Sequence, residues 1–379
     1  MALFFIIVFS VYLLVNLYLF FKGYRAVSYF HGNHAIYITT FIILAFSFII
    51  GKVTERTHPS VFSDILNILG SFWLAFMLYG FLLFLVSDIV YLIFRFSGIL
   101  PVEKIPAFRK WAYISTIVVS LSLIVVGFIN ALIPVTRHYE INISKAACGI
   151  KNLRIAAVSD IHLGSIIRKR SIVKLSRMLS DVKPDVIFLL GDIVDGEIGP
   201  VMRNDLLKYF NCPKCRDGLL AITGNHEFIG GASVTIPYIE KNGIRILKDE
   251  AVVIDGCIQV IGRLDRDGLR YRNEGRKPLS KLMEQVDSSK PVILLDHQPF
   301  NLDEAEKAGV DLQLSGHTHN GQMWPLNYIT KKIYEVSSGY KKKGNTHIIV
   351  SSGFGIWGPR VRLGSRPEII VVDITFSGN

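Results

Sequence analysis

The chain has 379 residues, of which half are hydrophobic, and a formal net charge of +11. This length suits more than one domain, and the apolar content indicates that not all of the chain is soluble. The apolar excess lies almost entirely near the N-terminus. Basic residues form no dense stripe with interleaved aromatic residues, so we expect no nucleic-acid partner.

Four apolar runs near the N-terminus predict helices that cross a bilayer, whose hydrocarbon core is about 30 Å thick. They are Ala2 to Phe21, Ile36 to Gly51, about Leu66 to Phe94, and Ala112 to Pro134. The first run lacks the basic segment and the cleavage site of a signal peptide, so we expect a retained anchor. Residues 1–137 are therefore predicted to be a four-helix transmembrane region, and residues 138–379 a second domain.

The short loops between these runs predict an orientation, because Lys and Arg favour the cytoplasmic side. The basic residues of the first and third loops are Lys22, Arg25, Arg95, Lys104, Arg109 and Lys110. The second loop has Lys52 and Arg56 beside Glu55. This bias places both chain ends, and with them the second domain, outside the cytoplasm.

Two further polar features of the sequence have more than one interpretation. Asp88 interrupts the third apolar run, where an acid is a functional candidate, but pairing within the helix bundle explains it equally well. Cys212 and Cys215 form a C-x-x-C pair without the second pair that a structural zinc site needs. They form either a local disulfide or an incidental turn, and the four cysteines predict no disulfide framework.

From about His138 onward, short apolar segments alternate with helical patterns, which predicts a layered α/β domain. The expected strands are Leu153 to Val158, Val186 to Leu190, Leu219 to Ile222, Val292 to Leu295 and Leu312 to Leu314. The expected helices include Ser171 to Val182, Val201 to Phe210 and Leu279 to Val286. Further β-rich segments are Ala251 to Ile261 and the chain from His347 onward.

Each of the five expected strands is followed by side chains of the kinds that bind metal ions. The segments are Ser159-Asp160-Ile161-His162, Gly191-Asp192, Gly224-Asn225-His226-Glu227, Asp296-His297-Gln298 and Gly316 to Gln322, GHTHNGQ. Because ligands gather at the carboxyl ends of strands, we expect one edge of the sheet to be a metal-binding rim. Mixed nitrogen and oxygen ligands without thiolate favour Mn, Fe or Zn. Two such ions about 3.5–4 Å apart clamp a phosphate and activate a water for in-line attack.

The ordered set D-x-H, G-D, G-N-H-E, H and G-H-x-H resembles the calcineurin-like metallophosphoesterases over most of residues 150–379. The segments GHTHNGQMWP and SSGFGIWGPRVRLGSRPEI are similar to the bacterial membrane-associated YkuE/YaeI-like branch. The resemblance implies a layered β-sandwich flanked by helices and a metal-dependent phosphoester hydrolase. It also implies an integral protein of a bacterial inner membrane.

The same resemblance implies a role for each matching residue. One metal would be bound by Asp160, His162 and His319, the other by Asn225, His297 and His317, with Asp192 bridging the two. His226 would protonate the leaving oxygen or stabilise charge on the phosphoryl group, and Asp195 would orient it. Asp195 is alternatively a loop acid that caps a turn. Arg360 and Arg362 are either surface arginines or ligands of a second phosphate.

Three functions are compatible with these features. The leading one is a membrane-anchored phosphodiesterase or phosphatase acting on a phospholipid or lipid-linked phosphoester, since four helices are unnecessary for a freely diffusing substrate. Related enzymes hydrolyse UDP-2,3-diacylglucosamine, whose cytoplasmic location conflicts with the predicted orientation. The alternatives are a broad-specificity phosphatase or nucleotidase for soluble phosphoesters, and a metal-binding membrane scaffold without turnover. An intact His226 argues against the scaffold, which needs no general acid.

Overall fold

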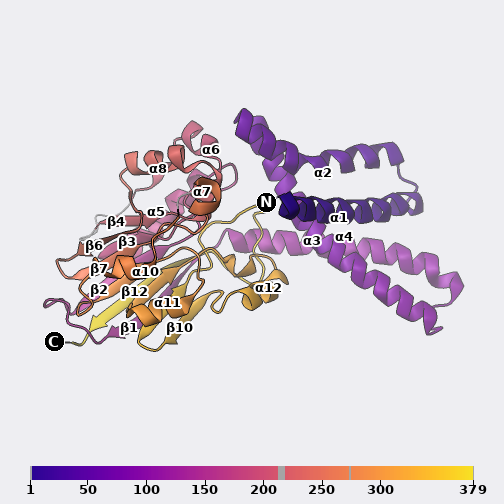
Figure 1. The fold of residues 1–379 in the computed structure, drawn as a ribbon. Coiled ribbons are helices and arrows are strands. Elements are labelled where there is room, and N and C mark those ends of the chain that lie inside the picture. The colour runs from indigo at the N-terminus through magenta and orange to yellow at the C-terminus, as the bar shows by residue number, and fades with distance from the viewer. Residues whose placement is uncertain (1, 212–217, 273–274, 379) are drawn as a thin grey trace. The chain divides into compact units, whose positions relative to one another are not determined.

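The computed structural model describes residues 2–211, 218–272 and 275–378. The chain divides into two compact units (Figure 1). One comprises residues 1–129 with 358–361, and the other comprises residues 130–357 with 362–379. The C-x-x-C pair, Cys212 and Cys215, lies outside the described residues.

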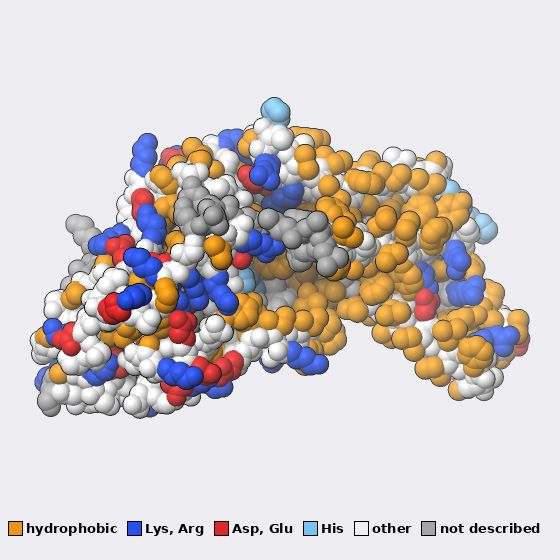
Figure 2. All heavy atoms as spheres, in the orientation of Figure 1, with side chains coloured by type: hydrophobic (Ala, Val, Ile, Leu, Met, Phe, Trp, Pro, Cys, Tyr) orange, Lys and Arg blue, Asp and Glu red, His pale blue; other side chains and the backbone are white. Residues whose placement is uncertain are grey.

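The first unit consists of four helices that are long and apolar enough to cross a membrane. They are α1 (Ala2–Tyr29), α2 (His34–Thr57), α3 (Val61–Phe96) and α4 (Ile105–Ala131), so each predicted apolar run forms a helix. Hydrophobic side chains cover these helices (Figure 2), as lipid-facing surfaces require. Two polar side chains inside the bundle pair with each other: the Trp73 indole donates to Asn16 Oδ1 at 3.0 Å.

The second unit contains two six-stranded sheets. The first sheet has the order β1 (Val135–Ile143), β12 (Glu368–Phe376), β2 (Asn152–Val158), β3 (Val186–Leu189), β4 (Leu219–Ile222) and β5 (Arg245–Leu247). The second has the order β10 (Gly339–Lys343), β11 (Thr346–Val350), β9 (Leu312–Ser315), β8 (Val292–Leu295), β7 (Ile258–Gly262) and β6 (Glu250–Ile254). Strands β2 to β5 are parallel, as are β11, β9, β8 and β7.

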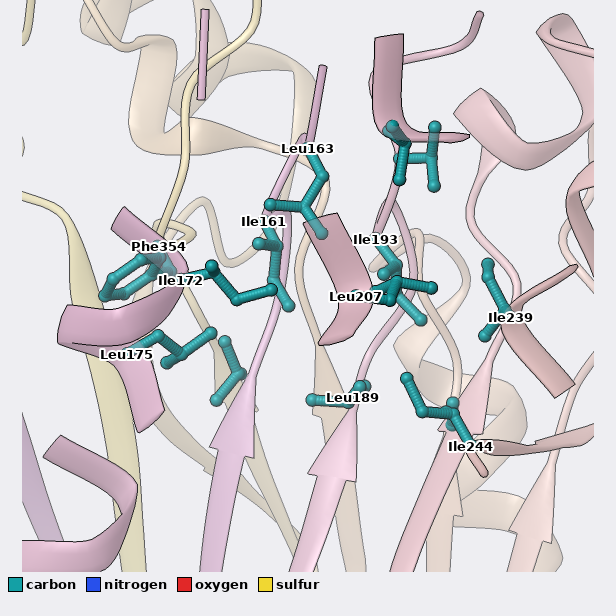
Figure 3. Packing of buried hydrophobic residues seen from close by; sticks show 14 of the residues in the cluster. Ile161, Leu163, Ile172, Leu175, Leu189, Ile193, Leu207, Ile239, Ile244 and Phe354 are labelled. Atoms are coloured by element: carbon teal, nitrogen blue, oxygen red, sulfur yellow. The ribbon is translucent and has the colours of Figure 1, made fainter. Parts of the chain in front are cut away.

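The two sheets pack face to face, with helices on both outer surfaces. Successive strand residues point to opposite faces, so Val186 and Phe188 of β3 enter the core between the sheets. Ile187 and Leu189 of the same strand point outward, where they pack against α5 (Lys169–Val182) and α8 (Ala232–Lys241), as Figure 3 shows for Leu189. On the other side, α10 (Leu279–Met283) and α11 (Leu302–Ala308) cover the second sheet. The predicted layered β-sandwich flanked by helices is confirmed.

Several details differ from the sequence prediction. The five predicted strands exist, but they lie in two sheets, so the metal-binding rim belongs to two sheets rather than to one edge. The helix expected at 201–210 is interrupted: α6 (Gly199–Arg203) ends before Asp205, whose left-handed φ of 44° separates it from a 3₁₀ turn at Leu206–Tyr209. Helix α10 ends at Met283 rather than at Val286. Strand β1, which begins at Val135, was not predicted.

One disulfide joins distant parts of the second unit. Cys148, after β1, bonds to Cys257 in the turn between β6 and β7, with the two Cα atoms 5.9 Å apart. The bond therefore connects the first sheet to the second across 109 residues of sequence. The sequence analysis predicted no disulfide framework and did not predict this bond. Two single cysteines so far apart in the chain form no spacing pattern from which their pairing could be read.

Candidate metal centre

The polar segments that follow β2, β3 and β4 of the first sheet meet those that follow β8 and β9 of the second. Backbone hydrogen bonds tie the segments together: Asp160 N donates to Gly191 O at 3.0 Å, and Gly316 N donates to His297 O at 2.9 Å. Side chains add to these bonds, since His226 N donates to Asp192 Oδ1 at 2.8 Å. All five predicted strand ends therefore meet at one place.

The backbone of this rim is held in an unfavourable conformation. Five of the seven predicted metal ligands have positive φ values between 47° and 70°: Asp160, His162, Asp192, His317 and His319. Residues with a side chain rarely adopt the left-handed region, and such strain concentrates at functional sites. Close packing adds a constraint, because a Cβ at Gly316 would lie 2.6 Å from Asp160 Oδ2. The surrounding structure thus fixes the ligand side chains.

Asp160, His162 and His319 form a first buried group of potential ligand atoms. His319 Nε2 lies 3.1 Å from His162 Nε2 and 3.3 Å from Asp160 Oδ1. His162 Nε2 lies 3.8 Å from the same carboxylate oxygen. Three ligand atoms thus converge on a space that a single cation fits.

Asp192, His297 and His317 form a second group. His297 Nδ1 lies 2.6 Å from Leu190 O, to which it donates a hydrogen bond, and its Nε2 lies 3.2 Å from Asp192 Oδ2. A backbone carbonyl on one ring nitrogen leaves the other nitrogen free to bind a metal. Asp192 Oδ2 also lies 3.8 Å from His162 Nε2, so this carboxylate faces both groups.

Unpartnered polar atoms indicate that these groups fit metal ions. Within the described part of the chain, Asp160 Oδ1, Asn225 Oδ1 and His297 Nε2 are buried and make no hydrogen bond. Buried polar groups are normally paired, and each unpaired one costs free energy. Bound cations at the two groups would satisfy all three atoms, which belong to residues that the sequence predicted as ligands.

His226 and Asp195 form a third group with His162 beside the first two. Asp195 Oδ1 lies 3.4 Å from His226 Nδ1 and 3.2 Å from His162 Nδ1. One carboxylate therefore faces two imidazole rings. The side chain of His226 is 22% exposed, whereas that of His162 is fully buried, so of these two rings only His226 reaches solvent.

Burial and charge divide the four predicted ligand histidines into two pairs with different pKa values. Burial opposes protonation of His162, but the neighbouring carboxylates of Asp160, Asp195 and Asp192 raise its pKa to about 10. Burial acts likewise on His297, whose pKa is nevertheless held well above its usual value by Asp192. Burial lowers the pKa of both His317 and His319 to about 4. Without metal, two rings are therefore cationic at neutral pH and two are neutral.

The sequence analysis missed the role of Glu227, the last residue of G-N-H-E. Its buried carboxylate accepts hydrogen bonds from four backbone N–H groups, which belong to Asp192 at 3.0 Å, Ile193 at 2.8 Å, Val194 at 3.1 Å and Gly224 at 2.7 Å. Glu227 therefore joins the loop after β3 to the loop after β4. The G-N-H-E motif contained this residue, but its partners are distant in sequence.

Arg362 is neither a surface arginine nor available to a second phosphate. It is fully buried and donates to backbone carbonyls, including those of Ser352 at 2.7 Å and Gly353 at 3.2 Å. Its Nη2 also lies 3.1 Å from His319 Nδ1. Arg362 thus holds the glycine-rich segment and positions His319.

A pocket of about 450 Å³ opens onto the candidate centre. Its lining includes predicted ligand residues, among them Asp192, Asn225 and His317. The same lining includes the largely apolar side chains of Leu326 and Ile329 of α12 (Leu326–Ile333), together with Tyr334 and Trp357. We call the ligand residues of this lining the ionic floor, and Leu326, Ile329, Tyr334 and Trp357 the apolar wall.

Comparison with known proteins identifies the family. Residues 153–321 match the calcineurin-like phosphoesterase model. The chain is similar to an uncharacterized metallophosphoesterase of Aquifex aeolicus, with 36% identity over 64% of this chain and 92% of that protein. It is similar to the uncharacterized metallophosphoesterase YkuE of Bacillus subtilis, with 30% identity over 62% of this chain and 84% of that protein. The chain therefore belongs to the calcineurin-like phosphoesterases.

A third relative is named as a transmembrane protein. A transmembrane protein with metallophosphoesterase domain from Bos taurus is 30% identical over 67% of this chain and 60% of that protein. Together with the four apolar helices, this similarity identifies a membrane protein. The predicted family and its YkuE-like relatives are confirmed, and the protein is a metal-dependent phosphoester hydrolase.

Proposed function

We propose that this protein is a membrane-anchored phosphoesterase with a dinuclear metal centre, and that its substrate is a lipid-linked phosphoester. The pocket supports this proposal, because a single space of about 450 Å³ is lined by both ligand residues and apolar side chains. A phosphate on the ionic floor leaves an attached apolar group against Leu326, Ile329 and Trp357. UDP-2,3-diacylglucosamine is one member of this substrate class, and nothing in the pocket favours it over the others.

We assign Asp160, His162 and His319 to one ion and Asn225, His297 and His317 to the other, with Asp192 shared between them. The convergence of these groups and their unpartnered atoms support the assignment. Two divalent ions of Mn, Fe or Zn, when bound, supply positive charge for the phosphate and a reactive water at neutral pH. The protein supplies the fixed orientation of the ligands through its strained backbone.

We assign His226 as the general acid that protonates the leaving oxygen, with Asp195 as its positioning residue. His226 lines the pocket and is partly exposed, which suits proton transfer to a bound phosphoester. Asp195 Oδ1 lies 3.4 Å from His226 Nδ1, where it can fix the orientation of the ring. Its second neighbour, His162, makes Asp195 a link between the acid and the first group of ligands.

The apolar wall extends beyond the pocket onto the surface of α12. Trp324, Tyr328, Ile329 and Ile333 are each about half exposed or more, and Lys331 and Lys332 lie in the last turn of the same helix. Aromatic, aliphatic and basic residues in this combination favour the boundary between lipid headgroups and acyl chains. A soluble phosphoester would need no such surface.

We place the catalytic unit outside the cytoplasm, in an inner membrane of bacterial type. Basic residues predominate in the first and third loops, which supports this orientation. The Cys148–Cys257 disulfide supports it independently, because disulfides persist in oxidising compartments and are rare in the cytosol.

The test uses the purified full-length protein in lipid nanodiscs with Mn²⁺. We expect hydrolysis of bis-p-nitrophenyl phosphate, loss of at least about 100-fold in Asp192→Asn, and faster turnover of a diacyl phosphodiester than of its water-soluble headgroup analogue. Equal turnover of the two would reject the lipid substrate and favour a broad phosphatase. Mn²⁺ binding without any turnover, unchanged in His226→Ala, would instead indicate a scaffold.

A further inference from the structure

A second cavity lies within the first unit, among α1, α3 and α4. Its volume is about 480 Å³, and its lining contains three cations, Lys22, Arg25 and Arg109, but one carboxylate, Asp88. The remaining lining is largely aromatic and apolar. The cavity is formed by helices of the membrane unit alone and shares no residue with the metal centre.

The single carboxylate, Asp88, is already paired with one of the three cations. Asp88 forms an ion pair with Lys22 and accepts a hydrogen bond from Tyr18 Oη at 2.7 Å. Asp88 is therefore paired within the helix bundle, which is one of the two interpretations that the sequence left open. This pair leaves Arg25 and Arg109 as the net positive charge of the cavity.

Neither arginine is neutralised within the membrane unit. Arg109 donates to the neutral phenols of Tyr29 at 3.5 Å and Tyr91 at 3.4 Å, and its guanidinium lies 5.1 Å from the ring centre of Tyr91. No carboxylate of the described residues forms an ion pair with Arg25 or Arg109. Unpaired charge among membrane helices is costly, so an anion at this place would stabilise the bundle.

The position of the cavity along the helices identifies the kind of anion. Lys22 and Asp88 lie about two turns from the C-terminal ends of α1 and α3, and Arg109 lies in the second turn of α4. At 1.5 Å per residue these groups lie within about 12 Å of the helix ends, close to headgroup depth. Phe21 and Leu92 line the cavity and are exposed on the lipid-facing surface, where acyl chains pass.

We propose that this cavity binds the phosphate of an anionic phospholipid headgroup, with Arg25 and Arg109 as its donors. Guanidinium groups bind phosphate through paired N–H donors, and basic pockets between membrane helices accept anionic headgroups. The aromatic lining accommodates the glycerol and the first methylenes of the lipid. The bound lipid is a structural ligand of the anchor and not the substrate of the metal centre.

The experiment measures lipid retention by the full-length protein with native mass spectrometry, after exchange into phosphatidylglycerol, phosphatidylcholine or inorganic phosphate. We expect wild-type protein to retain phosphatidylglycerol at least tenfold more than phosphatidylcholine. Arg25→Gln with Arg109→Gln should abolish this preference. Arg95→Gln is the matched control, because Arg95 is an exposed cation in the last turn of α3 outside the cavity, and it should retain the wild-type preference.

A gain-of-function variant separates binding from folding. Asp88→Asn removes the acid of the cavity, so retention of phosphatidylglycerol should rise, which a misfolded bundle would not show. Hydrolysis of bis-p-nitrophenyl phosphate by the double arginine variant should stay at the wild-type level. Unchanged retention in that variant, or equal retention of the two lipids, would overturn the proposal. Retention of inorganic phosphate without any preference between the two lipids would likewise overturn the proposal, because it would show that the cavity binds a soluble anion.

Discussion

At the scale of single residues, the candidate centre depends as much on side chains that never touch substrate as on the ligands. Glu227 fixes two loops through four backbone donors, and Arg362 fixes the segment beside His319. Both are buried charged groups with several hydrogen bonds, which is the condition under which burial of a charge is tolerated. Glu227 and Arg362 therefore stabilise the strained backbone conformations of the ligand residues.

Replacement of Glu227 by Ala should strongly destabilise the catalytic unit. The change leaves four buried N–H groups without an acceptor, which costs at least about 3 kcal/mol. We expect a lower melting temperature of the full-length protein and weaker Mn²⁺ binding. Glu240→Gln, which removes only an exposed partner of Lys248, is the control. Equal melting temperatures for the two variants would contradict the role given to Glu227.

Metal binding should release protons, and affinity should rise with pH. The pKa of His162 is raised to about 10 and that of His297 lies well above its usual value, so both rings are protonated at pH 7 without metal. Each must lose its proton to bind an ion, so affinity falls about tenfold per pH unit and per proton as pH decreases. Titration calorimetry in buffers of different ionisation enthalpy measures the release.

A histidine outside the centre provides the control for this proton release. His347→Gln changes a ring that contacts Tyr340 and Asn142, and it should leave the number of released protons unchanged. A binding enthalpy of the wild-type protein that does not depend on the buffer would show that the two rings are already neutral.

At the scale of elements, α12 gives the pocket its apolar character. The helix follows the GHTHNGQ segment, which links the last two predicted ligands, His317 and His319, to Leu326 and Ile329. The same short stretch of chain therefore supplies both the ionic floor and the apolar wall. Its sequence, LNYITKKI, is too short and too polar to be recognised as a membrane-facing helix without its position beside the pocket.

Ile329→Ser should separate lipid-linked from soluble substrates. Loss of apolar contact with the substrate costs about 1.5 kcal/mol, or about tenfold in kcat/KM. Hydrolysis of bis-p-nitrophenyl phosphate should be unchanged, because this substrate has no acyl chain to contact Ile329 and the side chain, which is 57% exposed, is not one of the assigned ligands. Val253→Ser alters an equally exposed apolar residue on β6 as a control. A parallel decrease for both substrates would argue against an apolar substrate group.

At the scale of the whole molecule, the catalytic unit is two sheets held together at both ends. The candidate metal centre joins them at the carboxyl ends of the strands, and the Cys148–Cys257 disulfide joins them elsewhere. The core between the sheets is made of buried aliphatic residues, mainly Ile, Leu and Val, with Phe188 and Phe376. Removal of either connection should therefore act on both sheets together.

Reduction of the disulfide should lower the melting temperature of the wild-type protein. A bond that closes a loop of 109 residues contributes about 5 kcal/mol, or roughly 10–20 °C for a unit of this size. Cys148→Ser should melt at the temperature of the reduced protein and should not respond to reductant. A wild-type protein that melts at the same temperature with and without reductant would show that the bond is not formed.

The sequence alone determined the four apolar helices, the five strands and the family. These follow from local patterns: apolar runs, β-branched segments, and polar motifs in a fixed order. The helix expected at 201–210 failed because Asp205 adopts a left-handed conformation that periodicity does not reveal.

Only the tertiary structure decided how those pieces meet. It divided the five strands between two sheets, paired Cys148 with Cys257, and placed Glu227 and Arg362 beneath the ligands. It also brought Arg25, Asp88 and Arg109 together in the lining of one cavity. Each of these is a contact between residues far apart in the chain, which depends on packing and is not written in any local pattern.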